Sequence, residues 1–308
     1  MVQDEARGRV ALPAVAVGVI AVSSAAVLIR LSEAPALAVA FWRCALGVAI
    51  LLPPAVLRKE RFPTGKTLYV GIASGVALGA HFGFWIVSLD YTSVAASVVL
   101  VSNTPVFVAI LAYLFFGERT SPLSFAGILV ALAGTAVIAQ DGSAGSAAIF
   151  GNALAILGAV TFTVYVLVGR SQRSGAEPLG VLPYSIVLYS AAAGALLPAA
   201  LLSGDGLWGY SWETWFWLWA IALGPQILGH TVFNWALGYV EASVVSGAVL
   251  AEPVIASVLA WLILAEKPGP ATVLGGVVVL TGLFFLLRGR RGSPSAEPAV
   301  EPEVVGRE

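Results

Sequence analysis

Apolar residues occur along the chain in blocks long enough to cross a membrane as helices, with only a handful of residues between consecutive blocks. About 17–25 apolar residues in a helix span the roughly 30 Å hydrocarbon core of a bilayer. We predict ten such spans, at residues 10–30, 35–57, 67–89, 93–116, 122–140, 147–169, 178–202, 214–238, 242–264 and 270–288. The predicted fold class is therefore an all-α polytopic membrane protein, whose short loops leave no room for a soluble catalytic domain.

The second half of the chain repeats the first. Residues 91–134 and 239–282 align without a gap, at a separation of 148 (239 − 91). The matching pairs are Tyr91 and Tyr239, Pro105 and Pro253, Glu118 and Glu266, Pro122 and Pro270, Gly127 and Gly275, and Gly134 and Gly282. An apolar composition produces chance matches of Ala, Val and Leu, but not this register of other residue types. We therefore predict two five-helix repeats, residues 10–140 and 147–288, between tails at residues 1–9 and 289–308. The second tail is rich in Pro, Glu and Ala, and we expect it to be disordered.

A repeat with an odd number of crossings ends on the side of the membrane opposite to where it began. The second repeat should therefore be inserted upside down relative to the first, with Glu118 and Glu266 at opposite faces. Inverted repeats are typical of secondary transporters, which hold their substrate near the bilayer midplane between the two halves. Rocking of one half against the other then exposes the same site to each side in turn.

The distribution of charge predicts the orientation in the membrane. Charged residues make up 11% of the chain and hydrophobic residues 59%, against roughly 25% charged residues in a soluble domain. With ten spans, basic residues gather on one side, at Arg7, Arg9, Arg58, Lys59, Arg61, Lys66, Arg119, Arg170, Arg173, Arg288, Arg290 and Arg291. The opposite loops carry only Arg30 and Lys267. Because basic loops stay in the cytoplasm, we predict a multi-pass plasma (inner) membrane protein with both termini cytoplasmic.

Three segments of the sequence resemble a known family. They are the stretch from Tyr91 that includes NTPVFVAILAYLFFGERTS, its partner from Tyr239 that includes EPVIASVLAWLILAEKPG, and Phe41-Trp42-Arg43 in the second span. In their order and repetition they are similar to the EamA-type transporters of the drug/metabolite transporter superfamily, over about residues 10–288. The resemblance implies a ten-helix bundle of two inverted halves, with a central cavity lined chiefly by the first, third, fourth, sixth, eighth and ninth helices. It also implies transport of amino acids, other small metabolites or drugs, often by export.

Polar residues inside the spans are the candidates for a substrate pathway, because such groups are costly in hydrocarbon unless they face a cavity or a partner. Glu252, immediately before Pro253, is either a protonatable group for substrate binding or proton coupling, or a hydrogen-bonded residue at a proline kink. Gln226, His230 and Asn234 lie four residues apart in the eighth span and would share one face of an α-helix. We predict that this face meets a polar or hydrated neighbour.

His81 and His230 are the only histidines in the chain, and they lie one residue apart once the repeat offset is applied. Each could titrate near neutral pH or form a hydrogen bond between helices. His81 shares a helix face with Trp85, and we predict both in the substrate pathway. Together with Glu252, the two histidines are the candidate proton carriers. We expect no metal site, since no acidic or thiol cluster accompanies them and the single cysteine is Cys44.

Three further positions are candidates for the same pathway. Ser24 in the first span and Tyr165 in the sixth could supply hydroxyl groups, although bonding to their own helix or anchoring a helix pair is the alternative role. Asn103 precedes Pro105 in the fourth span, where the second repeat has Ala251. The repeat is therefore asymmetric at a place where a site is expected.

Arg43 lies within the second span and has three possible roles. Its side chain could extend to the membrane interface, pair with a carboxylate such as Asp90 or Glu33, or receive an anionic group of the substrate. We favour the first two roles from the sequence.

These features predict a secondary active transporter that exports a small metabolite, such as an amino acid or a related amphipathic solute, by alternating access. Protons or the solute gradient would supply the energy, since the sequence has no nucleotide-phosphate motif. A facilitative uniporter or exchanger of the same fold is the alternative, followed by a membrane scaffold and an intramembrane enzyme. No catalytic residues are predicted, because the spans hold no HExxH-like or paired acidic motif. We expect a small-molecule substrate and the lipid bilayer as partners, no cofactor, no nucleic acid, and a monomer or homodimer.

Overall fold

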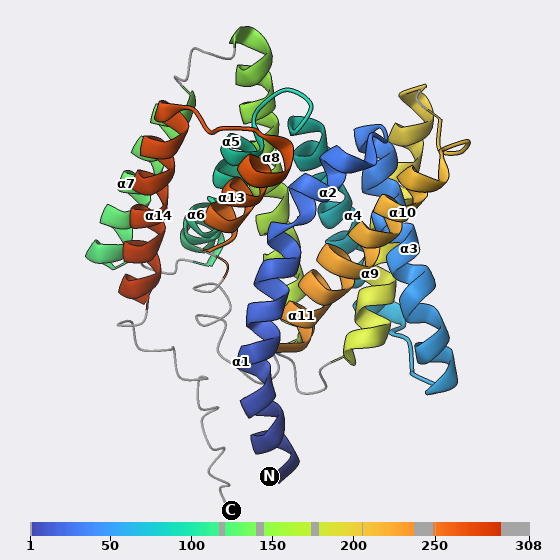
Figure 1. Cartoon of the computed structure of the whole chain (residues 1–308). Helices are drawn as coiled ribbons and strands as arrows, with labels where there is room; N and C mark the ends of the chain where they lie inside the picture. Colours follow the sequence, from blue (N-terminus) through green and yellow to red (C-terminus); the bar gives the residue numbers. More distant parts are fainter. Residues whose placement is uncertain are drawn as a thin grey trace, which may run out of the picture.

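Helices account for every regular element in the described part of the protein (Figure 1). The computed structural model describes residues 2–116, 121–139, 145–173, 179–204, 206–236, 249 and 251–290. The first half of the chain forms α1 (Val2–Ser23), α2 (Ala25–Ser32), α3 (Ala36–Leu57), α4 (Gly65–Ser88), α5 (Val94–Val101), α6 (Thr104–Phe116) and α7 (Pro122–Ala139). The second half forms α8 (Gly145–Arg173), α9 (Val181–Leu202), α10 (Trp212–Ile221), the π-helix η2 (Ala222–Thr231), α11 (Val232–Ala236), α13 (Glu252–Leu264) and α14 (Pro270–Arg290). The predicted all-α class is confirmed.

Seven helical stretches among the described residues are long and apolar enough to cross a membrane: Pro13–Ser32, Ala36–Leu57, Gly65–Ser88, Gly145–Val168, Val181–Leu202, Trp212–Ala236 and Pro270–Gly289. The three other predicted spans coincide with shorter apolar helices at Val94–Phe107, Pro122–Ile138 and Glu252–Leu264. The chain is therefore a multi-pass membrane protein, while the count of ten crossings stays a prediction.

The ends of the chain differ from the predicted tails. α1 begins at Val2, so the backbone at residues 2–9 continues the first helix. α14 continues to Arg290, and the predicted disordered residues 291–308 lie outside the described part. Both differences extend a membrane helix beyond its apolar block, because helical hydrogen bonding does not require apolar side chains once the helix leaves hydrocarbon.

Two predicted spans each contain a short break in the helix. The first changes from α1 to α2 at Ser24, and the fourth changes from α5 to α6 at Ser102 and Asn103. Pro105 follows the second break in the first turn of α6, where the missing N–H of a proline leaves no helical bond unmade. Pro253 occupies the same place in α13. The repeated proline thus lies at a helix start in both halves of the chain.

Helices of the two halves pack against each other rather than forming separate bundles. α3 and α4 both contact α9, α4 also contacts α8, and α1 contacts η2 and α11. The largest buried cluster accordingly draws side chains from both halves, including α2, α3, α4, α9 and α10. Small residues allow the close approach of α4 to α9, where a Cβ placed on Gly79 would lie 2.8 Å from the carbonyl oxygen of Ala192.

α7 and α14 form a close pair at one side of the molecule (Figure 1). A Cβ on Gly127 would lie 2.6 Å from the carbonyl oxygen of Gly282, and a Cβ on Gly282 would lie 2.6 Å from that of Gly127. Gly134 and Gly275 meet in the same reciprocal way, each at 2.7 Å. Because Gly127 faces Gly282 and Gly134 faces Gly275, the two helices run in opposite directions. The Ser124 hydroxyl adds a 2.9 Å hydrogen bond to the carbonyl of Leu286.

Candidate functional site

A buried arginine links the two halves of the chain. Arg43 in α3 is fully buried, and its Nε donates a 2.8 Å hydrogen bond to Oε1 of Gln226 in η2. Its guanidinium lies over the ring of Phe82 in α4, at 3.8 Å from the ring centroid. Both terminal nitrogens, Nη1 and Nη2, are buried without a hydrogen-bond partner. The side chain therefore neither reaches the membrane interface nor pairs with Asp90 or Glu33.

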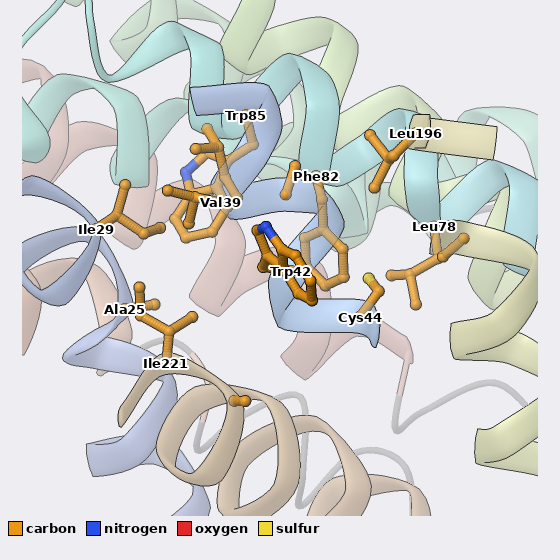
Figure 2. Packing of buried hydrophobic residues seen from close by; sticks show 14 of the residues in the cluster. Ala25, Ile29, Val39, Trp42, Cys44, Leu78, Phe82, Trp85, Leu196 and Ile221 are labelled. Carbon is orange, nitrogen blue, oxygen red and sulfur yellow. The ribbon is translucent and has the colours of Figure 1, made fainter. Parts of the chain in front are cut away.

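Two aromatic rings of α4 lie beside this arginine, with the guanidinium carbon 3.8 Å from the ring centroid of Phe82 and 5.9 Å from that of Trp85. Figure 2 shows Phe82 and Trp85 of α4 near Val39, Trp42 and Cys44 of α3, and all five belong to the largest buried cluster. A charge enclosed in this way loses its hydration, and its neighbours must supply the compensating interactions. The aromatic face of Phe82 and the amide oxygen of Gln226 supply part of them.

Gln226 is held by an unusual stretch of helix. η2 is a π-helix that contains Pro225, and the carbonyl oxygen of Gln226 accepts hydrogen bonds from the hydroxyls of Tyr189, at 3.3 Å, and Thr231, at 3.2 Å. A π-helix makes i→i+5 bonds, so side chains four apart no longer align as they do in an α-helix, and such segments are frequent at functional sites. The prediction of an uninterrupted α-helical stripe is therefore wrong for this segment.

The two histidines lie close to the same aromatic residues. Nδ1 of His81 donates to the carbonyl oxygen of Gly158 in α8 at 2.9 Å, and the imidazole stacks on Trp85 with centroids 6.0 Å apart. The ring of Phe162 in α8 lies 4.7 Å from His81 and 6.3 Å from His230. His230 is half-buried. The two histidines, which the repeat offset places one residue apart, therefore both adjoin the ring of Phe162.

The other candidate residues divide into two groups. The Tyr165 hydroxyl donates to Oδ1 of Asn234 at 3.3 Å, and Tyr165 contacts Phe162, so this pair adjoins the histidines. Ser24 instead donates to the carbonyl of Ala21 at 2.7 Å.

Asn103 and Glu252 lie at helix starts. The Asn103 amide donates to the carbonyls of Val99 and Leu100 at 3.3 and 3.2 Å, and its Oδ1 is buried without a partner. Glu252 is half-buried in the first turn of α13, within electrostatic range of Arg43. We call Arg43, His81, Trp85, Gln226, His230 and Asn234 the central polar cluster.

Comparison with known proteins places this chain in a family. The EamA-like transporter family matches residues 10–140 and, a second time, residues 149–288. The chain belongs to the EamA-like transporter family. The resemblance noted in the sequence is thereby confirmed, and the protein is a membrane transporter.

Relatives in this family carry transporter names. An uncharacterized transporter from Archaeoglobus fulgidus is 27% identical over 277 residues, covering 83% of this chain and 98% of that protein. The pseudopaline exporter CntI from Pseudomonas aeruginosa is 25% identical over 295 residues, covering 95% of this chain and 100% of that protein. A solved crystal structure has the same fold, with a TM-score of 0.63, 18% identity and coverage of 92% of this chain and 98% of that one.

The two family matches divide the central polar cluster. Arg43, His81 and Trp85 belong to the first matched segment, whereas Gln226 and His230 belong to the second. The hydrogen bonds from Arg43 to Gln226 and from His81 to Gly158 therefore cross between the two EamA-like segments. The polar groups of this transporter gather where its halves meet.

From the sequence, a part for Arg43 in this site was the least favoured of its three possible roles. A signal was available, because the apolar block around Arg43 contains no acidic residue, which makes pairing within its own helix impossible. Phe82 and Phe162, which contact the histidines, gave no signal because isolated aromatic residues are common throughout the spans.

Proposed function

We propose that this EamA-like transporter is a secondary active transporter that exports a small metabolite by alternating access, with its binding site at the central polar cluster. The observation that carries the proposal is the buried hydrogen bond between Arg43 and Gln226. Polar groups in the membrane are costly, and they are usually retained where they handle a solute or an ion. Here they lie between the two halves, where alternating access needs its site.

The pairing of α7 with α14 supports an inverted arrangement of the two halves. Gly127 corresponds to Gly275 and Gly134 to Gly282 in the repeat, so the contact of Gly127 with Gly282 maps onto the contact of Gly275 with Gly134. Equivalent helices that meet antiparallel and reciprocally are what a two-fold axis in the membrane plane produces. A parallel duplication would instead bring these helices together in the same direction.

A second contact between the halves supports a gate. Oε1 of Glu266, after α13, accepts a 2.6 Å hydrogen bond from the backbone N–H of Val94, the first residue of α5. A helix N-terminus favours a negative charge at this place. The repeat offset gives Glu118 and Ala242 as the counterparts, which lie outside the described residues. In an inverted transporter one such contact would lie at each face, and breaking either would open the site to that side.

Cysteine labelling tests the inversion directly. We expect Lys267→Cys to react with an impermeant maleimide from outside intact cells, and Arg119→Cys to react only after permeabilisation. Both variants are made in a Cys44→Ala background, which is itself the control because Cys44 is the only cysteine. Labelling of both positions from the same side would overturn the inverted arrangement and with it the alternating-access proposal.

Proton coupling would use Glu252. Its carboxyl group is half-buried, and Arg43 is the charged group that acts on it. Glu252→Gln should leave a flux that no longer responds to an imposed pH gradient, because the amide cannot exchange a proton. The measurement is solute flux in proteoliposomes with and without the gradient, and Glu213→Gln, at an exposed position of α10, is the matched control.

The outcome of that measurement separates the energy sources. A wild-type flux that ignores the gradient would favour a facilitative uniporter or exchanger of the same fold. A gradient response that survives Glu252→Gln would move the coupling role to His81 or His230. The relative CntI is named an exporter, which supports export as the direction of transport. The basic residues on one predicted side of the membrane support a plasma-membrane orientation with both termini cytoplasmic.

A further inference from the structure

We infer that the central polar cluster binds the carboxylate of an organic acid, and that Arg43 is the residue that holds it. The inference rests on the proposed function and names the class of solute. It comes from the unused hydrogen-bonding capacity of the cluster. Five buried nitrogen atoms of the described residues donate to nothing: Nη1 and Nη2 of Arg43, Nε1 of Trp85, Nε2 of Gln226 and Nδ2 of Asn234.

These atoms are all donors, so the partner they need is an acceptor. Nε2 of Gln226 is identified as the donor end of its amide because Oε1 already accepts from Arg43. Guanidinium and indole nitrogens can only donate. Buried donors in native proteins nearly always have a partner, and several in one cluster indicate a ligand that brings several acceptor atoms.

The orientation of the guanidinium selects a carboxylate. Its Nε side is occupied by Gln226, and one face lies on the ring of Phe82 at 3.8 Å. The edge formed by Nη1 and Nη2 is the part that remains unpaired. Two parallel N–H groups on one edge match the two oxygens of a carboxylate, which arginine binds in a bidentate manner.

The positive charge of Arg43 also favours an anionic solute. A guanidinium stays protonated in proteins, and Arg43 is fully buried. Glu252 is the one carboxylate among the described groups that act on it, yet neither terminal nitrogen of Arg43 bonds to it. A bound organic anion would supply the missing counter-charge. An inside-negative membrane potential favours outward movement of an anion, so this class of solute suits the proposed direction.

The aromatic residues near Arg43 indicate the chemistry of the rest of the solute. Trp85 lies 5.9 Å from the guanidinium carbon, and Phe82 and Phe162 extend the aromatic surface towards both histidines. An acid with an apolar or aromatic body would place its carboxylate at Arg43 and its body against these rings.

Matched acid and amide probes test the inference on the purified full-length protein. The probes are acetate against acetamide and benzoate against benzamide, and the readout is the probe-dependent shift in melting temperature at equal ionic strength. We expect an acid to bind at least about tenfold more tightly than its amide, as a charge-assisted bidentate contact warrants. Arg43→Gln should abolish this preference, whereas Arg30→Gln, at an exposed arginine of α2, should retain it.

A second variant keeps the test decisive if Arg43→Gln does not fold. Gln226→Glu preserves the acceptor for Nε of Arg43 and places a permanent carboxylate against the guanidinium. It should raise the melting temperature without probe and remove the preference for acids. Equal binding of acids and amides by the wild type, or a preference that survives in both variants, would overturn the inference.

Proteoliposome flux separates this inference from the proposed function. If benzoate binds through Arg43 but is neither carried nor able to compete with a carried solute, the transport proposal fails while the anion site stands. If solutes without a carboxylate are carried by the wild type and by Arg43→Gln alike, the anion site fails while the transport proposal stands.

Discussion

Gly282→Ala should destabilise the protein severely by forcing α14 away from α7. An added Cβ would contact the backbone nitrogen of Ala131, and it would lie 2.6 Å from the carbonyl oxygen of Gly127 and 2.8 Å from Cα of Ala131. All three atoms are backbone, so no side-chain rotation can relieve the overlap. Overpacking of a close contact typically costs about 1–3 kcal/mol, and we expect a loss in the upper part of that range, measured as thermal unfolding of the purified protein.

Gly276→Ala is the matched control for this prediction. It lies on the same helix, but an added Cβ would find only Cγ2 of Val99 at 3.6 Å, an ordinary contact. Alanine is preferred over glycine within a helix by up to about 1 kcal/mol, so this variant should be as stable as the wild type or more so. Equal destabilisation by both substitutions would mean that α14 does not need its close approach to α7.

The glycines at this contact recur in the sequence repeat, although the sequence did not predict that the two helices contact each other. Gly127, Gly134, Gly275 and Gly282 recur with the repeat offset, and they are the residues at which the two backbones meet. A close approach of helices excludes every larger side chain, so the constraint is visible in the sequence. The spans were predictable for a similar reason, because the hydrocarbon core of the bilayer requires apolar side chains along the whole helix that crosses it.

The local geometry of the site was less predictable. Gln226, His230 and Asn234 have a spacing that fits an α-helix. Within η2 the carbonyl oxygen of Gln226 accepts hydrogen bonds from Thr231 and from Tyr189, and the latter lies in a different helix. Tertiary contacts of this kind leave no periodic pattern in the sequence.

The contact between Arg43 and Gln226 was not predictable because the two residues are distant along the chain. Gln226 lies 183 residues away, and an ungapped repeat relates equivalent residues rather than contacting ones. The sequence predicted Trp85 and Gln226 in the pathway without showing that Arg43 bonds to Gln226 and lies 5.9 Å from the ring of Trp85. Ser24 takes the alternative role considered from the sequence, since its hydroxyl donates to the carbonyl of Ala21.

Arg43→Met combined with Gln226→Leu should stabilise the protein while removing its preference for acids. Arg43 is fully buried with two unpaired nitrogens, and a buried charge costs several kcal/mol unless it is well compensated. Replacing buried ionic groups by apolar residues of similar volume is often stabilising by about 1–4 kcal/mol. The second substitution is needed because Gln226 would otherwise lose the donor to its Oε1.

This double variant separates a binding role for Arg43 from a structural one. Replacing a residue that holds the helices together lowers the melting temperature. Replacing a residue that is kept for ligand binding at the expense of stability raises the melting temperature. Arg30→Met is the control: Arg30 donates to the carbonyl of Thr92 at 3.1 Å from an exposed position, and its loss should not stabilise. A lower melting temperature for the double variant, with acid binding retained, would make Arg43 a structural residue and leave the donors of the cluster without a ligand.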